Sequence, residues 1–396
     1  MFSTSRPAPS PTERNRVILA GIAALILTVG LARFAYTPML PIMRREIGLT
    51  PLAGGWLATL NYAGYISGAL LAALTSDLQR KFIYYRVGLV LAVLTTAAMG
   101  LTSNLWLWLL LRYLSGLSSC AGLLIASGLV LNWLMRNRLR PELGLHFSGI
   151  GLGIVISGLA VAGLQTGLHW DGQWLGLGGL GLLFFIPAWI WMPKPQAPGA
   201  AQSAATAMRP APRGWMALFV ASYFCAGFGY VISATFIVAI VETVPLLSHA
   251  GSWVWVLVGA AALPSTFVWD RIASAAGANQ ALLLAYALQI VSCALPVVSQ
   301  QPWAGLVSAM LWGATFVGIV SLTLSIIGRR FPANPAKAMA RLTLSYGVAQ
   351  IIAPVLAGAI ATRSGSYLGA LVLACWVMLA GMLLLGLLLA REKAAG

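Results

Sequence analysis

The stretch that decides the fold is RVILAGIAALILTVGLARFAYTPMLPI, residues 16–42. It exceeds the ~20 apolar residues that an α-helix needs to cross the hydrocarbon core of a bilayer. It is too long for the apolar region of a signal peptide, and a second apolar run follows almost at once. We therefore expect a retained helix that spans the membrane.

Eleven more apolar runs of spanning length follow along the chain. They predict an all-α membrane protein with twelve transmembrane helices. With the first run, the predicted spans are 16–42, 52–75, 84–102, 105–131, 143–168, 173–192, 214–241, 252–269, 279–299, 303–328, 339–361 and 366–390.

The composition excludes other classes of protein. Of 396 residues, 60% are hydrophobic and 8% are charged, and the mean hydropathy is +0.87. Soluble domains carry ~25% charged residues and cannot hide so much apolar surface. Disordered chains have low hydrophobicity. A water-soluble enzyme and a disordered protein are both excluded.

The distribution of basic residues predicts the orientation. The chain has 24 Lys and Arg against 8 Asp and Glu. With the N-terminus inside, the outer loops hold only Arg44, Arg45 and Arg363, and nearly all other basic residues lie inside. This asymmetry predicts a multi-pass protein of the bacterial inner membrane with both termini cytoplasmic. The basic residues lie in short clusters between apolar runs, and no nucleic-acid-binding motif accompanies them. We therefore expect the lipid bilayer, and no nucleic acid, as partner.

The stretch 193–213, PKPQAPGAAQSAATAMRPAPR, is rich in Pro and Ala and predicts a flexible linker. It divides the spans six and six. The expected organisation is a cytoplasmic tail (1–15), a six-helix bundle (16–192), a cytoplasmic linker (193–213), a second six-helix bundle (214–390) and a short cytoplasmic tail (391–396). The halves echo each other in GALLAALTSDLQRK (68–81) and GAAALPSTFVWDR (259–271). Two parallel repeats around a central path are typical of transporters.

Several motifs resemble the major facilitator superfamily. RYLSGLSSCA (112–121) is similar to the family's fourth-helix motif, and DLQRK (77–81) to a degenerate form of its loop between helices two and three. GLARFAYTPMLPIM (30–43) and GFGYVISATF (227–236) resemble the YbfB/YjiJ-type bacterial branch. The resemblance implies two pseudo-symmetric six-helix bundles and alternating-access transport by a secondary transporter, and it leaves the cargo open.

Arg33 and Arg112 are the strongest candidates for a binding role. An ionisable residue inside a span costs roughly 2.5–3.5 kcal/mol on insertion scales and marks a functional hypothesis. Both lie near mid-membrane, in the first and fourth spans, which the resemblance places around the central cavity. A guanidinium fork suits carboxylate or phosphate. We expect an anion-binding pocket. The alternative for Arg112 is a structural role in bonding helix carbonyls.

None of the eight acidic residues lies near mid-membrane, which favours an anionic ligand over a cationic drug. Polar contacts and apolar walls for the pocket are predicted, with packing as the alternative for each residue, from Tyr36, Asn61, Tyr65, Tyr230 and Trp312.

Gating and proton coupling are predicted from residues near the ends of spans. Asp77 and Asp270 could cap an opposing helix or pair with a basic residue such as Arg136 or Arg329, and the predicted gate also includes Arg80. The alternative is that these charges only fix topology. Glu242 and His146 are the candidates for proton coupling, with an interfacial and a packing role as their alternatives.

The sequence carries no pattern for catalysis, a cofactor or a metal. Cys120, Cys225, Cys293 and Cys375 lie inside apolar runs, and no Ser/His/Asp spacing or phosphate loop is found. We expect no enzyme activity and no cofactor. The predicted function is gradient-driven transport of a small solute, an organic anion such as a carboxylate, by a monomer, with a proton as candidate co-substrate. The alternatives are a multidrug or metabolite efflux pump and a non-transporting membrane sensor.

Overall fold

A computed structural model describes residues 10–140, 143–195, 214–331 and 335–394. Every regular element in these segments is a helix. Eleven helices are long and apolar enough to cross a membrane, and a bent pair raises the number to twelve. This confirms the predicted all-α membrane fold. The predicted linker 193–213 and tail 1–15 fall largely outside the described residues.

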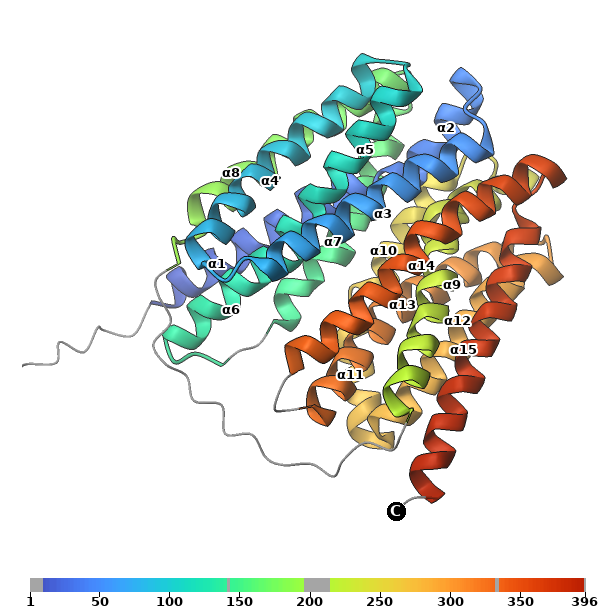
Figure 1. The fold of residues 1–396 in the computed structure, drawn as a ribbon. Helices are drawn as coiled ribbons and strands as arrows, with labels where there is room; N and C mark the ends of the chain where they lie inside the picture. Colours follow the sequence, from blue (N-terminus) through green and yellow to red (C-terminus); the bar gives the residue numbers. More distant parts are fainter. Residues whose placement is uncertain (1–9, 141–142, 196–213, 332–334, 395–396) are drawn as a thin grey trace, which may run out of the picture.

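The first half contains six spans, drawn in blue to green in Figure 1. The first span joins three consecutive helical segments, and the fourth joins three more. The elements are α1 (Pro11–Leu25), η1 (Ile26–Phe34), α2 (Tyr36–Ile47), α3 (Pro51–Leu74), α4 (Leu78–Ala98), η2 (Met99–Leu101), α5 (Leu105–Cys120), η3 (Ala121–Ala126), α6 (Ser127–Arg136), α7 (Gly144–Leu164) and α8 (Trp170–Trp191).

The second half lies beside the first and is drawn in yellow to red (Figure 1). Its second span is bent: α10 and α11 meet at an angle of 40° at Pro264, which lacks the N–H that a continuous helix would use. The elements are α9 (Trp215–Val241), η4 (Pro245–Leu247), α10 (Gly251–Ala262), α11 (Ser265–Ala276), α12 (Ala278–Val298), α13 (Pro302–Arg330), α14 (Pro335–Ser364) and α15 (Leu368–Ala394).

The two ends of the bundle are distinguished by the helix ends that lie there, and the two halves are in close contact between them. We call the end where α1 and α9 begin and α15 finishes the terminal end, and the opposite one, with the α2–α3 turn, the far end (Figure 1). The most extensive contacts between the halves are those of α3 with α14 and of α7 with α10, and α2 also packs on α9. The first pair is so close that a Cβ added to Gly55 would lie 2.4 Å from the carbonyl oxygen of Pro354.

The first span differs from the continuous helix predicted over 16–42. It begins at Pro11, where Ser10 and Glu13 form a capping box, and residues 26–34 form a π-helix. Residues 121–126 of the fourth span form a second π-helix beside it. A Cβ on Gly122 would lie 1.9 Å from Thr28 Oγ1, so only glycine fits this close approach. π-Helical segments occur frequently at functional sites.

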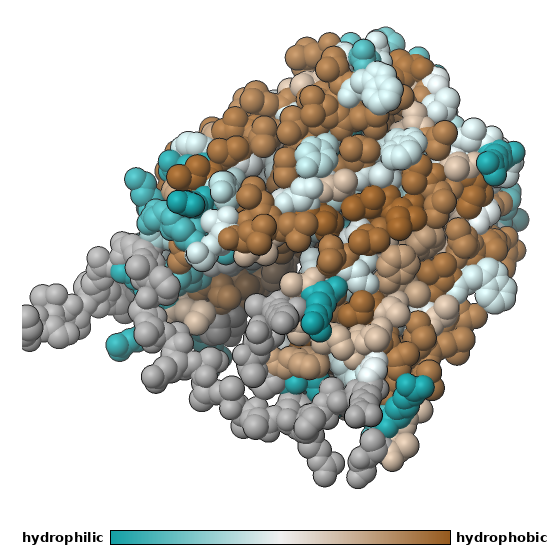
Figure 2. All heavy atoms as spheres, in the orientation of Figure 1, coloured by the Kyte–Doolittle hydropathy of each residue, from teal (hydrophilic) through white to brown (hydrophobic). Residues whose placement is uncertain are grey.

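The flank of the molecule is apolar. Figure 2 shows brown residues covering much of the side between the two ends. Large apolar side chains are exposed there, including Leu183, Ile190 and Leu383. A continuous exposed apolar surface of this kind suits a lipid environment.

Candidate substrate-binding site and gates

Arg33 lies on the π-helical segment η1 and is only 5% exposed. Its guanidinium carbon lies 4.4 Å from the ring centroid of Tyr62 and 4.7 Å from that of Tyr65, both on α3. These distances are within the range of cation–π attraction. The buried Nε atom has no hydrogen-bond partner among the described residues. Arg33 therefore keeps a donor that a ligand could use.

Arg112 lies next to Arg33 but is bonded differently. Its Nη1 donates to the carbonyl oxygen of Ala32 at 3.0 Å, its Nη2 to that of Arg33 at 3.4 Å, and its Nε to that of Leu57 at 3.4 Å. Its guanidinium carbon also lies 4.4 Å from the ring centroid of Tyr36. The structure thus brings the two predicted arginines together, and the contacts of Arg112 match the structural role left open for it.

Two of the carbonyls to which Arg112 donates, those of Ala32 and Arg33, belong to the irregular part of the first span. Pro38 has no N–H, so one carbonyl a turn earlier in the first span loses its backbone donor. Ser115, on the same helix as Arg112, also donates to the Ala32 carbonyl at 2.7 Å. The fourth span therefore satisfies the irregular backbone of the first. Ser115 was not predicted, because the carbonyl to which it donates belongs to the π-helical segment, which was itself not predicted.

Tyr36 and Asn61 also connect helices of the first half. The Tyr36 hydroxyl donates to the Gly54 carbonyl at 2.9 Å. Asn61 Nδ2 donates to the Arg112 carbonyl at 3.0 Å and lies 3.2 Å from Ser115 Oγ. Asn61 Oδ1 is buried without a partner among the described residues. Both predicted site residues thus lie beside the two arginines with part of their bonding already taken up by α3 and α5.

Five buried tyrosines from three helices lie next to Arg33 or to one another, and we call them the tyrosine cluster: Tyr62, Tyr65, Tyr223, Tyr230 and Tyr346. The ring of Tyr346 on α14 stacks on Tyr223 at 4.5 Å and lies 5.6 Å from Tyr230, both on α9. Tyr230, Tyr62 and Tyr65 all interact electrostatically with Arg33. The cluster bridges the two halves. Tyr346 was missed by sequence reasoning because one tyrosine in an apolar run gives no signal of the face it occupies.

Trp312 extends the aromatic surface into α13. Its ring is stacked with Tyr230 at 5.6 Å and 23°, with Phe316 at 4.7 Å and 13°, and with Trp255 at 6.0 Å and 25°. Its Nε1 is buried and has no partner among the described residues. Two of the predicted second-half residues, Tyr230 and Trp312, are thus in direct contact, and Tyr230 connects them to Arg33.

The charge of Arg33 is not balanced by a carboxylate within the described chain. The groups that act electrostatically on its guanidinium are tyrosines. Among the described acids, Glu242 caps the end of α9, and Asp77 caps the start of α4. Both positions are at helix ends, away from the middle of the spans. A buried cation without a counter-charge favours an anionic partner.

Two arginines of α2 tie the halves together at the far end. Arg45 forms an ion pair with Glu242, and Arg44 donates to the Tyr367 hydroxyl at 3.4 Å. Burial raises the pKa of the Glu242 carboxyl, while the positive charge of Arg45 opposes this rise. A groove of about 590 Å³ surrounds this ion pair and includes His249. These partners were not predicted, because Arg44 and Arg45 resemble ordinary loop charges in the sequence.

The predicted gate residues at the terminal end make mostly local contacts. Asp77 accepts from the backbone N–H of Gln79 at 2.8 Å and lies 3.7 Å from Arg80 Nε. Arg329 donates to Ser325 Oγ on its own helix at 2.9 Å. Asp77 therefore caps its own helix α4, whereas we expected it to cap an opposing helix or to pair with Arg136 or Arg329. Asp270 is exposed on α11.

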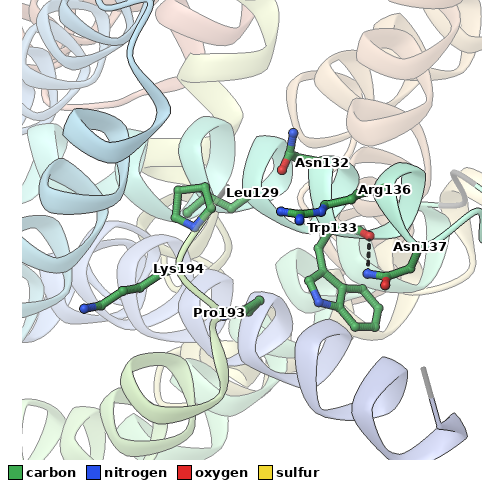
Figure 3. Close-up of a pocket in the computed structure, with 8 residues that line it drawn as sticks. Leu129, Asn132, Trp133, Arg136, Asn137, Pro193 and Lys194 are labelled. Atoms are coloured by element: carbon green, nitrogen blue, oxygen red, sulfur yellow. Dashed lines mark hydrogen bonds between the residues drawn. The ribbon is translucent and has the colours of Figure 1, made fainter. Parts of the chain in front are cut away.

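Arg136 lines a separate small pocket at the terminal end. Figure 3 shows Arg136 extending from α6 near Asn132, whereas the side chain of Lys194, in the segment that follows α8, points away from Arg136. The pocket holds about 110 Å³. Gln79 donates to the carbonyl of Pro195 at 2.5 Å, which brings the α3–α4 turn to the same segment. The predicted gate residues of the first half therefore gather around 193–195.

His146 is buried within the first half. Its Nε2 lies 2.8 Å from Ser127 Oγ, and its ring is packed against Gly21, where a Cβ would come within 2.3 Å of Nδ1. These contacts favour the packing role that was the alternative to proton coupling. Among the described residues, no group of three His, Cys, Asp or Glu side chains is arranged to hold a metal ion.

Comparison with known proteins identifies the class. A family model described as "Uncharacterised MFS-type transporter YbfB" matches residues 25–386, which is most of the chain. The chain belongs to this family of the major facilitator superfamily. Its membership confirms the predicted family and, with the helical architecture, the predicted fold. A comparison with curated proteins finds no significant match.

Solved transporters share the fold at low sequence identity. A mutant of the nucleoside transporter NupG has a TM-score of 0.74 at 12% identity, covering 94% of this chain and 99% of the other. A bacterial homologue of the human lysosomal transporter Spinster, in an inward-facing and occupied conformation, has a TM-score of 0.64 at 16% identity, covering 98% and 97%. At these identities the similarity establishes the fold alone.

Proposed function

We propose that this protein is a secondary active transporter that moves a small organic anion, such as a carboxylate, across the bacterial inner membrane by alternating access. The observation that carries the proposal is Arg33: a buried guanidinium with an unpartnered Nε, facing the second half through Tyr230. A carboxylate would supply both the missing charge and the missing hydrogen bond.

The closed far end supports the alternating-access part of the proposal. Hydrogen bonds cross between the halves there, from Thr37 Oγ1 to the Ala234 carbonyl at 2.6 Å and from Thr59 Oγ1 to the Ile351 carbonyl at 2.8 Å. The positive-inside rule assigns the terminal end to the cytoplasm and the far end to the periplasm. Transport then requires these contacts to break while the terminal ends approach each other.

A gradient is the proposed energy source, and Glu242 is the stronger of the two proton-coupling candidates. Its ion pair with Arg45 joins the halves, so its protonation state changes with opening of the far end. The gate residues Asp77, Arg80, Arg136, Asp270 and Arg329 are retained as a proposal for the cytoplasmic side.

The test is ligand-dependent thermal stabilisation of the purified protein. Monocarboxylates, dicarboxylates, sugar acids, amino acids and cationic drugs are screened against the wild type, Arg33→Gln and the control Arg363→Gln. Arg363 is an exposed residue near the far end, so its replacement removes the same charge outside the site. We expect a carboxylate to raise the melting temperature of the wild type and the control and to have no effect on Arg33→Gln.

Uptake of that carboxylate into proteoliposomes then distinguishes a transporter from a non-transporting sensor. Stabilisation by cationic amphipathic compounds alone would favour the efflux pump and overturn the anion proposal. Specific binding without uptake under any imposed ion gradient would favour the non-transporting sensor.

A further inference from the structure

The hydroxyls of the tyrosine cluster differ in their hydrogen bonds from those of three other buried tyrosines. Tyr36, Tyr85 and Tyr286 donate to backbone carbonyls, of Gly54 at 2.9 Å, Ala188 at 2.7 Å and Ser222 at 3.0 Å. Such pairing is usual, because a buried phenol needs a hydrogen-bond partner. Within the described chain, the five cluster hydroxyls make no bond to a backbone carbonyl. Tyr62 instead forms side-chain hydrogen bonds with Arg33 and with Tyr230. The hydroxyls of Tyr65, Tyr223 and Tyr346 therefore stay available near Arg33.

Tyr230 of this cluster and three further rings, those of Trp312, Phe316 and Trp255, form an aromatic wall. Three of these rings lie nearly parallel to that of Trp312. Relative to Trp312, the rings of Tyr230, Phe316 and Trp255 are tilted by only 23°, 13° and 25°. Trp312 and Trp255 are fully buried, whereas Tyr230 and Phe316 each keep 5% of their surface exposed. A planar ring that reaches Tyr230 would meet a face suited to offset stacking. Trp312 Nε1, buried and unpartnered, adds a donor beyond that face.

The cluster provides one positive charge for a ligand. Arg112 is the second buried cation of the described spans, and its three nitrogens already donate to carbonyl oxygens. Of these two arginines, Arg33 keeps an unpartnered buried donor, its Nε. A second carboxylate on the ligand would be buried among phenol rings without a cation, which is costly.

We propose that the substrate is a planar, ring-bearing monocarboxylate, whose carboxylate binds Arg33 and whose ring stacks on the Tyr230 side of the aromatic wall. This inference rests on the proposed function and narrows its substrate class. The unbonded phenol hydroxyls of Tyr65, Tyr223 and Tyr346 are the partners for polar substituents on that ring. Aliphatic dicarboxylates should bind more weakly because their second carboxylate lacks a cation, and sugar acids because they lack a planar ring that could stack.

Three probes test the inference by isothermal titration of the purified full-length protein: benzoate, cyclohexanecarboxylate and succinate. Benzoate and cyclohexanecarboxylate have similar size and the same charge, and only benzoate is planar. Stacking predicts that benzoate binds roughly 2- to 10-fold more tightly than cyclohexanecarboxylate, and that succinate binds more weakly than both. Arg33→Gln abolishes binding of all three.

Substitutions in the aromatic wall show which ring causes the preference for benzoate over cyclohexanecarboxylate. Tyr230→Leu removes the ring and should remove the preference for benzoate over cyclohexanecarboxylate, whereas Tyr230→Phe keeps the ring and should retain it. Trp312→Phe preserves a folded core and should retain part of the preference. Trp106→Leu is the control, because Trp106 is 79% exposed in the first turn of α5 and outside the site.

The outcomes distinguish this inference from the proposed function. Equal binding of benzoate and cyclohexanecarboxylate, still dependent on Arg33, overturns the ring preference and leaves anion transport standing. Tighter binding of succinate than of benzoate overturns the single-charge argument. Absence of Arg33-dependent binding for every carboxylate in the wider screen overturns the proposed function itself.

Discussion

Replacing Gly55 by alanine should open the far end. A Cβ at this position would lie 2.4 Å from the carbonyl oxygen of Pro354, 3.1 Å from its carbonyl carbon and 3.2 Å from Val355 Cα. All three atoms belong to the backbone of α14, so no side-chain rotation can relieve the contact. Ordinary van der Waals contact begins near 3.4 Å. The α3 and α14 backbones must therefore separate locally by about 1 Å.

Only the conformation with the far end closed bears the free-energy cost of this separation. Overpacking a well-packed contact costs about 1–3 kcal/mol. Because α3 and α14 belong to different halves, a state with the far end open escapes that cost. A difference of 1–3 kcal/mol changes the ratio of closed to open far ends by roughly 5- to 150-fold. Alanine also favours helix over glycine, so general unfolding is not expected.

Electron–electron double resonance between spin labels measures this ratio. Labels at Leu101→Cys and Leu246→Cys report on the far end of each half, since both side chains are more than 70% exposed, at 72% and 79%. The four native cysteines are first replaced. Gly55→Ala should increase the population at long distance, and Gly179→Ala, with nothing within 4 Å of its Cβ, should not. A distance distribution for a folded Gly55→Ala variant that equals the wild-type distribution would refute the reasoning.

Three further predictions follow from the site. Arg112→Gln should lower the melting temperature by far more than Arg33→Gln, because each carbonyl left without a donor costs about 1–3 kcal/mol; equal losses would contradict the structural role of Arg112. Burial raises the pKa of Glu242 in the closed far end, so this state binds a proton more readily than an open state with the carboxyl in water. Acidification should therefore shift spin-label distances toward the closed far end, and Glu242→Gln should remove that shift; a shift toward opening would be the wrong sign. His146→Gln should lower the melting temperature while the pH dependence of uptake stays unchanged, and a displaced pH profile would restore it as a proton-coupling residue.

The fold could be predicted because it is dictated by long-range composition. Apolar runs of spanning length specify helices in a bilayer whatever their exact side chains, which is why the twelve spans agree with the helices. The bend at Pro264 can be expected from the missing N–H of proline, whereas the π-helical segment 26–34 was not predicted. Hydropathy is insensitive to this segment, since its close contacts depend on hydroxyls and glycines of neighbouring helices.

The site was only partly predictable for a similar reason. Arg33 and Arg112 stand out in the sequence as equal charges inside spans. Their different roles depend on which guanidinium meets the carbonyls of Ala32 and Leu57, a question of three-dimensional packing. The pairing of Arg45 with Glu242 joins residues 197 positions apart and likewise has no local signature.

The central claim is that Arg33 holds the negative charge of the substrate, and one comparison tests it most directly. The carboxylate that best stabilises the protein and its neutral amide analogue are titrated against the wild type and Arg33→Gln. Losing a buried charge partner costs about 2 kcal/mol or more, so the wild type should prefer the carboxylate by about 30-fold or more. Arg33→Gln should show no such preference. If Arg33→Gln still discriminates between the carboxylate and the amide as the wild type does, Arg33 is not the anion-binding residue.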